Sequence, residues 1–286
     1  MKTHADLSGD GGSDILGQVV EQRRRVAQRL ASVGAVVAVA SGKGGVGKST
    51  VTALLAEALA ARGDRVGVVD ADVNGPCVPR LLGVAGRRPR LTDEGLVPPE
   101  TASGVAVMSS DLFLAGEDEP VRYAGPRDDA YTWRPTAEMT TVREFLSGTA
   151  WGKRDWLLLD LPPGAERLPS VLGIVPGLAG VLVVTIASPL ALRVVGTSVT
   201  VAREHGVRLL GLVENMAARP CAACGEPAAL FGEPGDVERA ADQMGIPLVA
   251  RIPFDAALAD GSATGAVTPE LTGLADRLAA SVTEHR

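Results

Sequence analysis

The sequence predicts an α/β fold in which a mostly parallel β-sheet is flanked by helices on both faces. Short apolar segments alternate with segments of helical periodicity along most of the chain, which is the pattern of successive βαβ units. Hydrophobic residues make up 46% of the 286 residues and aromatic residues only 3%, so the core must be mainly aliphatic. Aliphatic runs of this kind are typical of strands that are buried on both faces.

The individual elements follow from the local pattern. Residues 1–33 are expected to form a flexible leader, rich in Gly, Ser and Asp, and then one helix at 14–32. Residues 34–286 are expected to form one domain. The predicted strands are 35–40, 65–70, 105–109, 156–160, 180–186, 209–213 and 248–252, and helices are predicted at 48–61, 190–205 and 236–244. The segment 86–141 is the least regular, and we expect an insertion or a loop there.

Charge and hydropathy exclude several classes of partner. The formal net charge is −6 and Arg23, Arg24 and Arg25 form the one basic block, so we expect no nucleic-acid partner. Residues 1–14 lack the apolar core of a signal peptide, and apolar stretches such as 178–187 are too short to span a bilayer. Three cysteines do not make a secreted disulfide scaffold. We therefore expect a cytoplasmic protein with no membrane partner.

Residues 42–49 match the G-x-x-x-x-G-K-[S/T] pattern of a P-loop, between a predicted strand and a predicted helix. The backbone N–H groups of such a loop surround phosphate oxygens; Lys48 would reach the β and γ phosphates and the Ser49 hydroxyl would ligate Mg²⁺. The residues expected to bind nucleotide here are Gly42, Gly44, Gly45, Val46, Gly47, Lys48, Ser49 and Thr50. An ordinary glycine-rich turn is the alternative. The motif predicts a P-loop NTPase fold with ATP and Mg²⁺ as cofactors.

Acidic residues at two strand ends are candidates for the rest of the site. Asp70 and Asp72 follow the second predicted strand, whose carboxyl end should face the ligand crevice. We expect Asp72 to orient the attacking water and Asp70 to support the metal shell. Asp160 ends an apolar segment and precedes Leu-Pro-Pro-Gly, which is the Walker B form, so it would hold Mg²⁺ through water. Gly164 would then lie near the γ-phosphate as a switch. A solvated strand end is the alternative for Asp70 and Asp72.

A second lysine, Lys43, stands at the start of the loop, where ordinary P-loops do not need one. The Lys-Gly-Gly-x-Gly-Lys-[Ser/Thr] form resembles the deviant Walker A class, which includes MinD, ParA, nitrogenase iron protein and the Mrp/ApbC carriers. In that class the extra lysine crosses a dimer interface to the partner's nucleotide. The resemblance implies a homodimer, with Lys43 catalytic beside Lys48 and Asp72. A solvated surface lysine is the alternative.

Further stretches resemble the Mrp/ApbC family of iron–sulfur cluster carrier ATPases, over about residues 36–267. They are the Asp-Ala-Asp-Val-Asn-Gly-Pro run from Asp70, Asp160-Leu-Pro-Pro-Gly, Val-Glu-Asn-Met at 213–216, Cys-Ala-Ala-Cys-Gly at 221–225 and Ile-Pro-Phe-Asp at 252–255. The resemblance implies that Asn215 contacts the adenine base and that apo iron–sulfur proteins are clients.

The chain departs from the pattern of that family in three places. Members usually continue Pro-Pro-Gly with Thr-Gly-Asp, whereas this chain has Ala165-Glu166-Arg167, which leaves the γ-phosphate switch and the rate of hydrolysis open. Cys77 stands where a small hydroxyl residue is usual, and we interpret it as a small buried residue. The segment 125–141 looks altered and enlarged.

Cys221 and Cys224 form a C-x-x-C pair, which cannot by itself complete a four-coordinate site. Two copies across a dimer supply four thiolates, which suit a [4Fe–4S] cluster and equally suit Zn²⁺. The family resemblance favours an iron–sulfur cluster that bridges the dimer. A reduced pair with no metal is the alternative.

The function that we favour is a dimeric carrier that binds ATP, hydrolyses it slowly, and binds and transfers an iron–sulfur cluster. One alternative is a MinD/ParA-like ATPase that organises a partner. Membrane-binding organisers need a basic amphipathic tail, and the charge of 271–286 is nearly balanced. The other alternative is a nucleotide-gated adaptor stapled by zinc.

Overall fold

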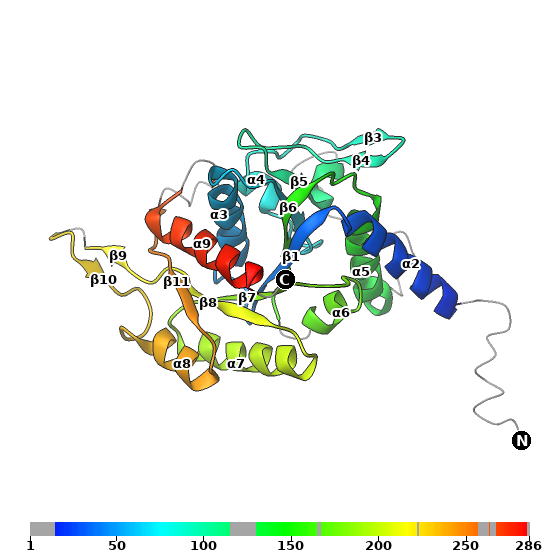
Figure 1. Ribbon diagram of the computed structural model, residues 1–286. Helices are drawn as coiled ribbons and strands as arrows, with labels where there is room; N and C mark the ends of the chain where they lie inside the picture. Colours follow the sequence, from blue (N-terminus) through cyan, green and yellow to red (C-terminus); the bar gives the residue numbers. More distant parts are fainter. Residues whose placement is uncertain are drawn as a thin grey trace, which may run out of the picture.

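A sheet of seven strands forms the centre of the protein in the computed structural model, which describes residues 15–114, 130–164, 167–221, 223–256, 263 and 267–284 (Figure 1). The strands lie in the order β11-β8-β7-β1-β6-β2-β5, and each neighbouring pair is parallel. Their bounds are β1 Val33–Ser41, β2 Val66–Asp70, β5 Ala106–Met108, β6 Arg154–Asp160, β7 Gly180–Thr185, β8 Leu209–Glu214 and β11 Leu248–Arg251. Each segment predicted as a strand is therefore a strand of one sheet.

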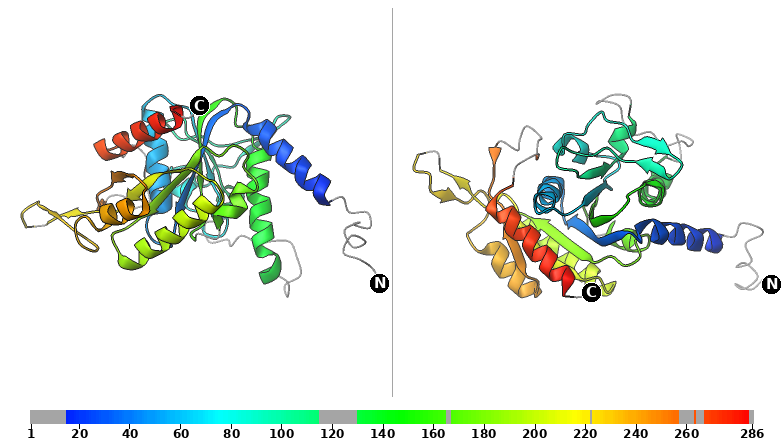
Figure 2. Two further views of the ribbon diagram at one scale, coloured as in Figure 1. Left: turned by 60° about the horizontal axis from the view of Figure 1, so that its bottom comes forward. Right: turned by 45° about the horizontal axis from the view of Figure 1, so that its top comes forward.

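Helices cover both faces of this sheet, as predicted (Figure 2). One face carries α3 (Lys48–Ala61), α4 (Val78–Leu81) and α9 (Pro269–Thr283). The other face carries α2 (Ile15–Leu30), α5 (Ala130–Gly148), α6 (Leu168–Leu172), α7 (Pro189–Glu204) and α8 (Asp236–Met244). A separate cluster of buried, mainly aliphatic side chains fills the space between the sheet and each helical layer.

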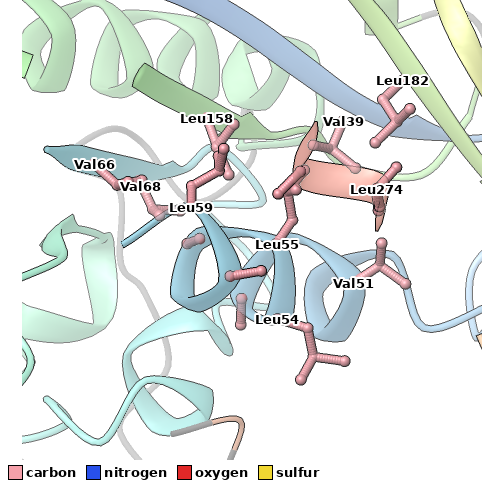
Figure 3. Close-up of a cluster of buried hydrophobic side chains, with 14 of the residues drawn as sticks. Val39, Val51, Leu54, Leu55, Leu59, Val66, Val68, Leu158, Leu182 and Leu274 are labelled. Carbon is pink, nitrogen blue, oxygen red and sulfur yellow. The ribbon is translucent and has the colours of Figure 1, made fainter. Parts of the chain in front are cut away.

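The packing of α3 holds the P-loop against the sheet (Figure 3). Every residue from Val51 to Leu59 is buried, because the helix lies between the sheet and α9. Leu55 and Leu59 are fully buried, and replacing either by alanine is expected to cost about 2–5 kcal/mol of stability. The first turn of α3 is thereby fixed at the carboxyl end of β1.

The segment 86–141 is more regular than the sequence analysis predicted. It contains the hairpin of β3 (Arg90–Thr92) and β4 (Gly95–Val97), the strand β5, the 3₁₀ helix η1 (Ser110–Phe113) and the start of α5. The prediction of a loop or insertion is wrong for these parts, apart from β5, which was predicted as a strand at 105–109. The helix α5 was missed because it gains its stability by burying Val142, Phe145 and Leu146 against the sheet rather than from composition. Residues 115–129 of this segment lie outside the described residues, and they include the start, 125–129, of the predicted enlargement at 125–141.

The helix predicted at 14–32 is α2, whose Val26 and Leu30 are buried against the sheet, while the leader at 1–13 lies outside the described residues. A second small hairpin, of β9 (Arg219–Pro220) and β10 (Pro227–Ala228), projects from the body on the side away from α2 (Figure 1). In the part of the chain that the structure describes, no helix combines the length and the apolar character that a membrane span needs.

Candidate functional site

The carboxyl ends of four strands meet at the candidate nucleotide site. β1 leads into the loop of residues 42–47, β2 ends at Asp70, β6 ends at Asp160, and Asn215 follows β8. In open α/β sheets, ligands bind outside the carboxyl ends of the strands, where the strand order reverses. β1 lies at such a point, since the chain runs from β1 to β2 on one side and from β6 to β7 across it. The fold therefore brings the predicted nucleotide-binding segments to one edge of the sheet.

At two glycines of the P-loop, the backbone lies very close to a neighbouring side chain. A Cβ atom at Gly42 would lie 2.8 Å from Cγ1 of Val194 on α7, so the loop passes directly over that helix. Gly47 has a φ of 78°, and a Cβ atom there would lie 2.2 Å from Nδ2 of Asn215. Both positions therefore require glycine. Of the other predicted loop residues, Gly44 and Gly45 are exposed, Val46 is buried, and Thr50 is half-buried.

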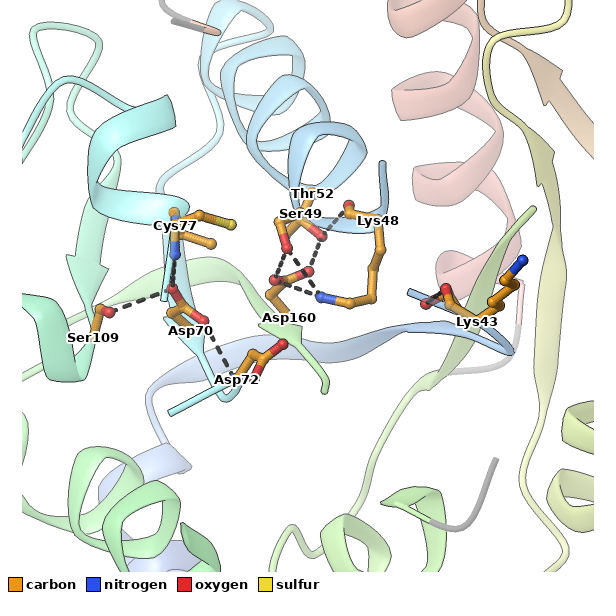
Figure 4. A network of polar contacts seen from close by, with 11 residues as sticks. Lys43, Lys48, Ser49, Thr52, Asp70, Asp72, Cys77, Ser109 and Asp160 are labelled. Atoms are coloured by element: carbon orange, nitrogen blue, oxygen red, sulfur yellow. Dashed lines mark hydrogen bonds and ion pairs between the residues drawn. The ribbon is translucent and has the colours of Figure 1, made fainter. Parts of the chain in front are cut away.

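Lys48, Ser49 and Asp160 form one buried polar network (Figure 4). Lys48 Nζ lies 2.6 Å from Asp160 Oδ2, and the Ser49 hydroxyl donates to the same oxygen at 2.5 Å. The Lys48 side chain is 6% exposed and that of Asp160 is fully buried, so each charge depends on the other for compensation. Hydroxyl and carboxylate oxygens are the ligands that Mg²⁺ prefers, and the pair Ser49 and Asp160 fits that ion.

Thr52 is a member of this network that the sequence analysis missed. Its side chain is fully buried, and the one proton of its hydroxyl is shared between Asp160 Oδ1, at 2.7 Å, and the carbonyl of Lys48, at 3.0 Å. The signal that could have revealed it is a hydroxyl residue one helical turn after Lys48, in a helix that is otherwise apolar on its inner side.

Asp70 is directly opposite Asp160 in the register of β2 and β6. Its side chain is fully buried, and its Oδ2 accepts hydrogen bonds from the backbone N–H groups of Cys77 and Val78, at 3.0 and 3.1 Å. Burial and the charge of Asp160 raise the pKa of Asp70 to about 8. In this structure, Asp70 therefore stabilises the start of α4 through these two hydrogen bonds. Its predicted role as a support of the metal shell stays a prediction.

Asp72 and Lys43, the other two predicted catalytic residues, lie on opposite sides of the network (Figure 4). Asp72 is half-buried in the loop after β2. Burial raises its pKa, Lys48 opposes this rise, and the charges of Asp160 and Glu138 add to it. Lys43 is exposed, and its side chain points away from Lys48 and Asp160. Lys43 therefore does not contact its own Walker B carboxylate, and its predicted action across a dimer stays a prediction.

Asn215 contacts the P-loop directly. Its side chain is buried, and Nδ2 donates to the carbonyl of Val46 at 2.9 Å. Met216, the next residue, has a φ of 53°, which is uncommon for a residue with a side chain. The predicted contact of Asn215 with adenine stays a prediction.

Cys221 and Cys224 lie in the loop that joins β9 and β10. The loop is closed by two backbone bonds, from Cys221 N to Glu226 O at 2.8 Å and from Gly225 N to Cys221 O at 2.9 Å. Backbone N–H groups of Ala223 and Cys224 donate to the Cys221 sulfur and lower the pKa of its thiol. Cys224 is exposed, and both thiols are free. Cys221 is half-buried, and a thiol with a lowered pKa is suited to metal binding at neutral pH.

Cys77 lies apart from this pair, at the N-terminal end of α4 beside Asp70. Burial and the charges of Asp70 and Asp160 raise the pKa of its thiol to about 11. Cys77 is half-buried and packs against the core, so the interpretation as a buried residue holds only in part. Its neutral thiol is a poor metal ligand.

Comparisons with known proteins agree with this geometry. A family model described as ParA, NUBPL iron-transfer P-loop NTPase, matches residues 32–282. The chain is 36% identical over 242 residues to the iron–sulfur cluster carrier protein of Saccharolobus solfataricus, which covers 84% of this chain and 78% of the relative. It is also 36% identical over 234 residues to the human cytosolic Fe-S cluster assembly factor NUBP2, covering 80% of this chain and 82% of the relative.

Two solved structures have the same fold. A nucleotide-binding protein from Archaeoglobus fulgidus, in complex with ADP and with cobalt found in it, is 36% identical and superposes with a TM-score of 0.72, over 87% of this chain and 95% of that chain. The cell-division ATPase MinD of Pyrococcus furiosus is 24% identical, with a TM-score of 0.58 over 88% of this chain and 100% of that chain.

Proposed function

Because the chain belongs to the NUBPL iron-transfer P-loop NTPase (ParA) family, we propose that it is a dimeric ATPase that binds an iron–sulfur cluster and transfers it to client apoproteins. The observation that carries the proposal is the combination, in one chain, of a P-loop network around Lys48 and Asp160 with an exposed dithiol hairpin at Cys221 and Cys224. The relatives named as cluster carriers or assembly factors support it. The human relative is named as cytosolic, and we propose a cytoplasmic location for this chain too.

Nucleotide binding begins with an exchange of partners at Lys48. In this structure the ammonium group pairs with Asp160, and the phosphates of ATP would replace that carboxylate as its partner. Ser49 and Asp160 would then hold Mg²⁺, which neutralises charge on the β and γ phosphates when it is bound. The backbone N–H groups of residues 42–50 would supply the remaining phosphate contacts, at the N-terminus of α3.

Hydrolysis would use two groups that stand outside the Lys48 network. Asp72 is placed at the loop after β2, and its role would be to orient the attacking water. Lys43 points away from its own Asp160, and in a dimer it would reach the phosphates bound by the partner. A cation that arrives only in the dimer stabilises charge that develops on the transferred phosphoryl group.

The cluster is the cargo of this cycle. Each protomer offers two thiols at Cys221 and Cys224, and a two-fold axis brings four thiolates together without any further residue. The lowered pKa of Cys221 favours the thiolate that iron requires. Because the hairpin projects from the body, the cargo would stay open to a client protein (Figure 1).

The test is anaerobic reconstitution of the wild type and of Cys221→Ala, Cys224→Ala and Cys77→Ala, followed by iron, sulfide and zinc analysis. We expect about four irons per dimer in the wild type and in Cys77→Ala, and loss of iron, sulfide and visible absorption in the other two variants. Cys77→Ala is the matched control, because this thiol has a raised pKa and lies away from the hairpin. Tightly held zinc without sulfide would instead support a zinc-stapled adaptor, and retention of a cluster after loss of both hairpin thiols would refute the site.

A further inference from the structure

One carboxylate on α5 joins the two loops that follow the acidic strand ends. Asn74 Nδ2 donates to Oε1 of Glu138, and Arg167 Nη1 donates to Oε2 of the same side chain at 3.0 Å. Asn74 lies two residues after Asp72, in the loop that follows β2. Arg167 lies three residues after Gly164, in the loop that follows β6. One oxygen of Glu138 therefore accepts a hydrogen bond from the first loop, and the other oxygen accepts one from the second loop.

Glu138 is held on a rigid support. α5 is anchored to the sheet by the buried side chains of Val142, Phe145 and Leu146. Glu138 is itself 6% exposed, and a carboxylate so deeply buried is stable only while hydrogen bonds and opposite charge compensate it. A change in the contact to one loop alters the compensation of this carboxylate, and so alters its contact to the other loop. The two loops are thus coupled through a group that belongs to neither of them.

The backbone N–H groups of Gly164 and Arg167 are both engaged in hydrogen bonds within the protein. The N–H group of Gly164 donates to the carbonyl of Ser41, at the end of β1, at 3.0 Å. The N–H group of Arg167 in turn donates to the carbonyl of Gly164 at 3.4 Å, so these two residues belong to one turn. If Gly164 is to offer its N–H group to a γ-phosphate, its bond to Ser41 must break, and a shift of Gly164 would act on Arg167 through the bond between them.

We propose that Glu138 is a positioning residue for ATP hydrolysis, which latches the loop of Asp72 to the loop of Gly164 so that both change position together. The inference rests on the proposed ATPase function, because it assigns a role within that reaction. Arg167 gives the latch its charge complementarity, since an acidic side chain at this position would be repelled by Glu138. The charge of Glu138 also acts on Asp72 itself, where it favours the protonated carboxyl. The loop of Asp72 is thereby linked to the loop of Gly164 through one side chain.

The kinetic test compares Glu138→Ala, Glu138→Gln and Arg167→Met with the wild type. We expect Glu138→Ala to lower kcat on the order of 10- to 100-fold, the effect of a small misplacement of reacting groups, with KM for ATP within about twofold of wild type. The double variant Glu138→Ala/Arg167→Met should be no slower than Glu138→Ala alone, because residues of one network are not additive. Glu138→Gln retains an acceptor for Asn74, so its kcat should lie between that of the wild type and that of Glu138→Ala. Glu144→Ala is the matched control, since Glu144 is an exposed glutamate of the same helix.

A second readout does not depend on hydrolysis. Hydrogen exchange of the backbone is followed in residues 72–78 and 167–172 of the nucleotide-free protein. Arg167→Met should raise exchange in 72–78, a segment linked to it through Glu138, by roughly twofold or more, and should have no such effect in the Glu138→Ala background. Unchanged exchange in 72–78, or multiplicative losses of kcat in the double variant, would overturn the latch. If the wild type does not hydrolyse ATP, the proposed function fails, and the exchange result alone decides whether the latch exists.

Discussion

The Thr52 hydroxyl lies 2.7 Å from Asp160 Oδ1, while Lys48 and Ser49 both bind the other oxygen of that carboxylate. One side chain on the second turn of α3 thus fixes the rotation of the Walker B carboxylate. The oxygen that would face Mg²⁺ is left on the side of Ser49. A helix residue with no direct path to the nucleotide therefore determines how the metal ligand is presented.

We predict that Thr52→Val weakens the binding of Mg²⁺–ATP, because Asp160 loses the bond that orients it. Loss of a group that orients a metal ligand typically reduces metal affinity about 10- to 100-fold. ATP affinity in the absence of Mg²⁺ should stay near that of the wild type, and Thr52→Ser should restore Mg²⁺ dependence. Calorimetric titration with ATP, in the presence and in the absence of Mg²⁺, measures the two affinities. An equal loss of affinity in the two conditions would assign Thr52 to packing alone.

Lys48→Ala should strongly weaken nucleotide binding. The variant loses a charged contact to the phosphates, and such contacts are worth about 1.5–3 kcal/mol, which is roughly tenfold or more in affinity. It also leaves Asp160 buried without the cation that compensates it. Calorimetry and phosphate release test the prediction, which is wrong if affinity and turnover both persist.

Lys43→Ala should lower kcat and leave ATP affinity nearly unchanged. Lys43 is exposed and does not contact Asp160, so ATP affinity should stay within about twofold of wild type. If the lysine acts on transition-state charge across a dimer, kcat should fall on the order of 10³-fold or more, as for an arginine finger. Steady-state phosphate release at saturating ATP gives kcat. Mixing Lys43→Ala with a binding-deficient partner provides the control for action in trans. A collapse of affinity with kcat preserved would make Lys43 a simple binding residue.

The stability of the nucleotide-free protein should depend on pH through Asp70. Its pKa is raised from 3.8 to about 8, so folding favours the protonated carboxyl. This contribution is fully present below about pH 4 and is lost as the pH rises towards 8. Relative to Asp70→Asn, the free energy of unfolding of the wild type should therefore decrease between pH 5 and pH 8. Urea denaturation in Mg²⁺-free buffer at both pH values measures the difference, and a constant difference would contradict the prediction.

The cysteines should differ in reactivity as their pKa values do. Cys221 has a lowered pKa because backbone N–H groups donate to its sulfur, whereas burial raises the pKa of Cys77 to about 11. The thiolate is the reactive species, so at pH 7 iodoacetamide should modify Cys221 well before Cys77. Mass spectrometry of the cluster-free protein over a range of pH gives the two rates, with Cys221→Ala to verify the assignment. Equal rates for Cys221 and Cys77 at pH 7 would show that the hairpin backbone does not activate the thiol.

The sequence by itself determined the features that depend on neighbours along the chain. Seven strands could be recognised because each is a contiguous apolar run, and all seven lie in one sheet. The P-loop, the Walker B strand end at Asp160 and the C-x-x-C turn are also local patterns. The helix α5 could not be recognised in this way, because its stability comes from side chains buried against the sheet rather than from its composition.

Only the tertiary structure decided which distant groups meet. Thr52 and Asp160 are 108 residues apart, Asn215 and Val46 are 169 apart, and Glu138 joins Asn74 and Arg167 across 64 and 29 residues. Strand order, register and helix packing set these pairings, and no local periodicity encodes them. The motifs therefore identified the chemistry of the site, whereas the packing of the helices on the sheet selected the residues that orient it.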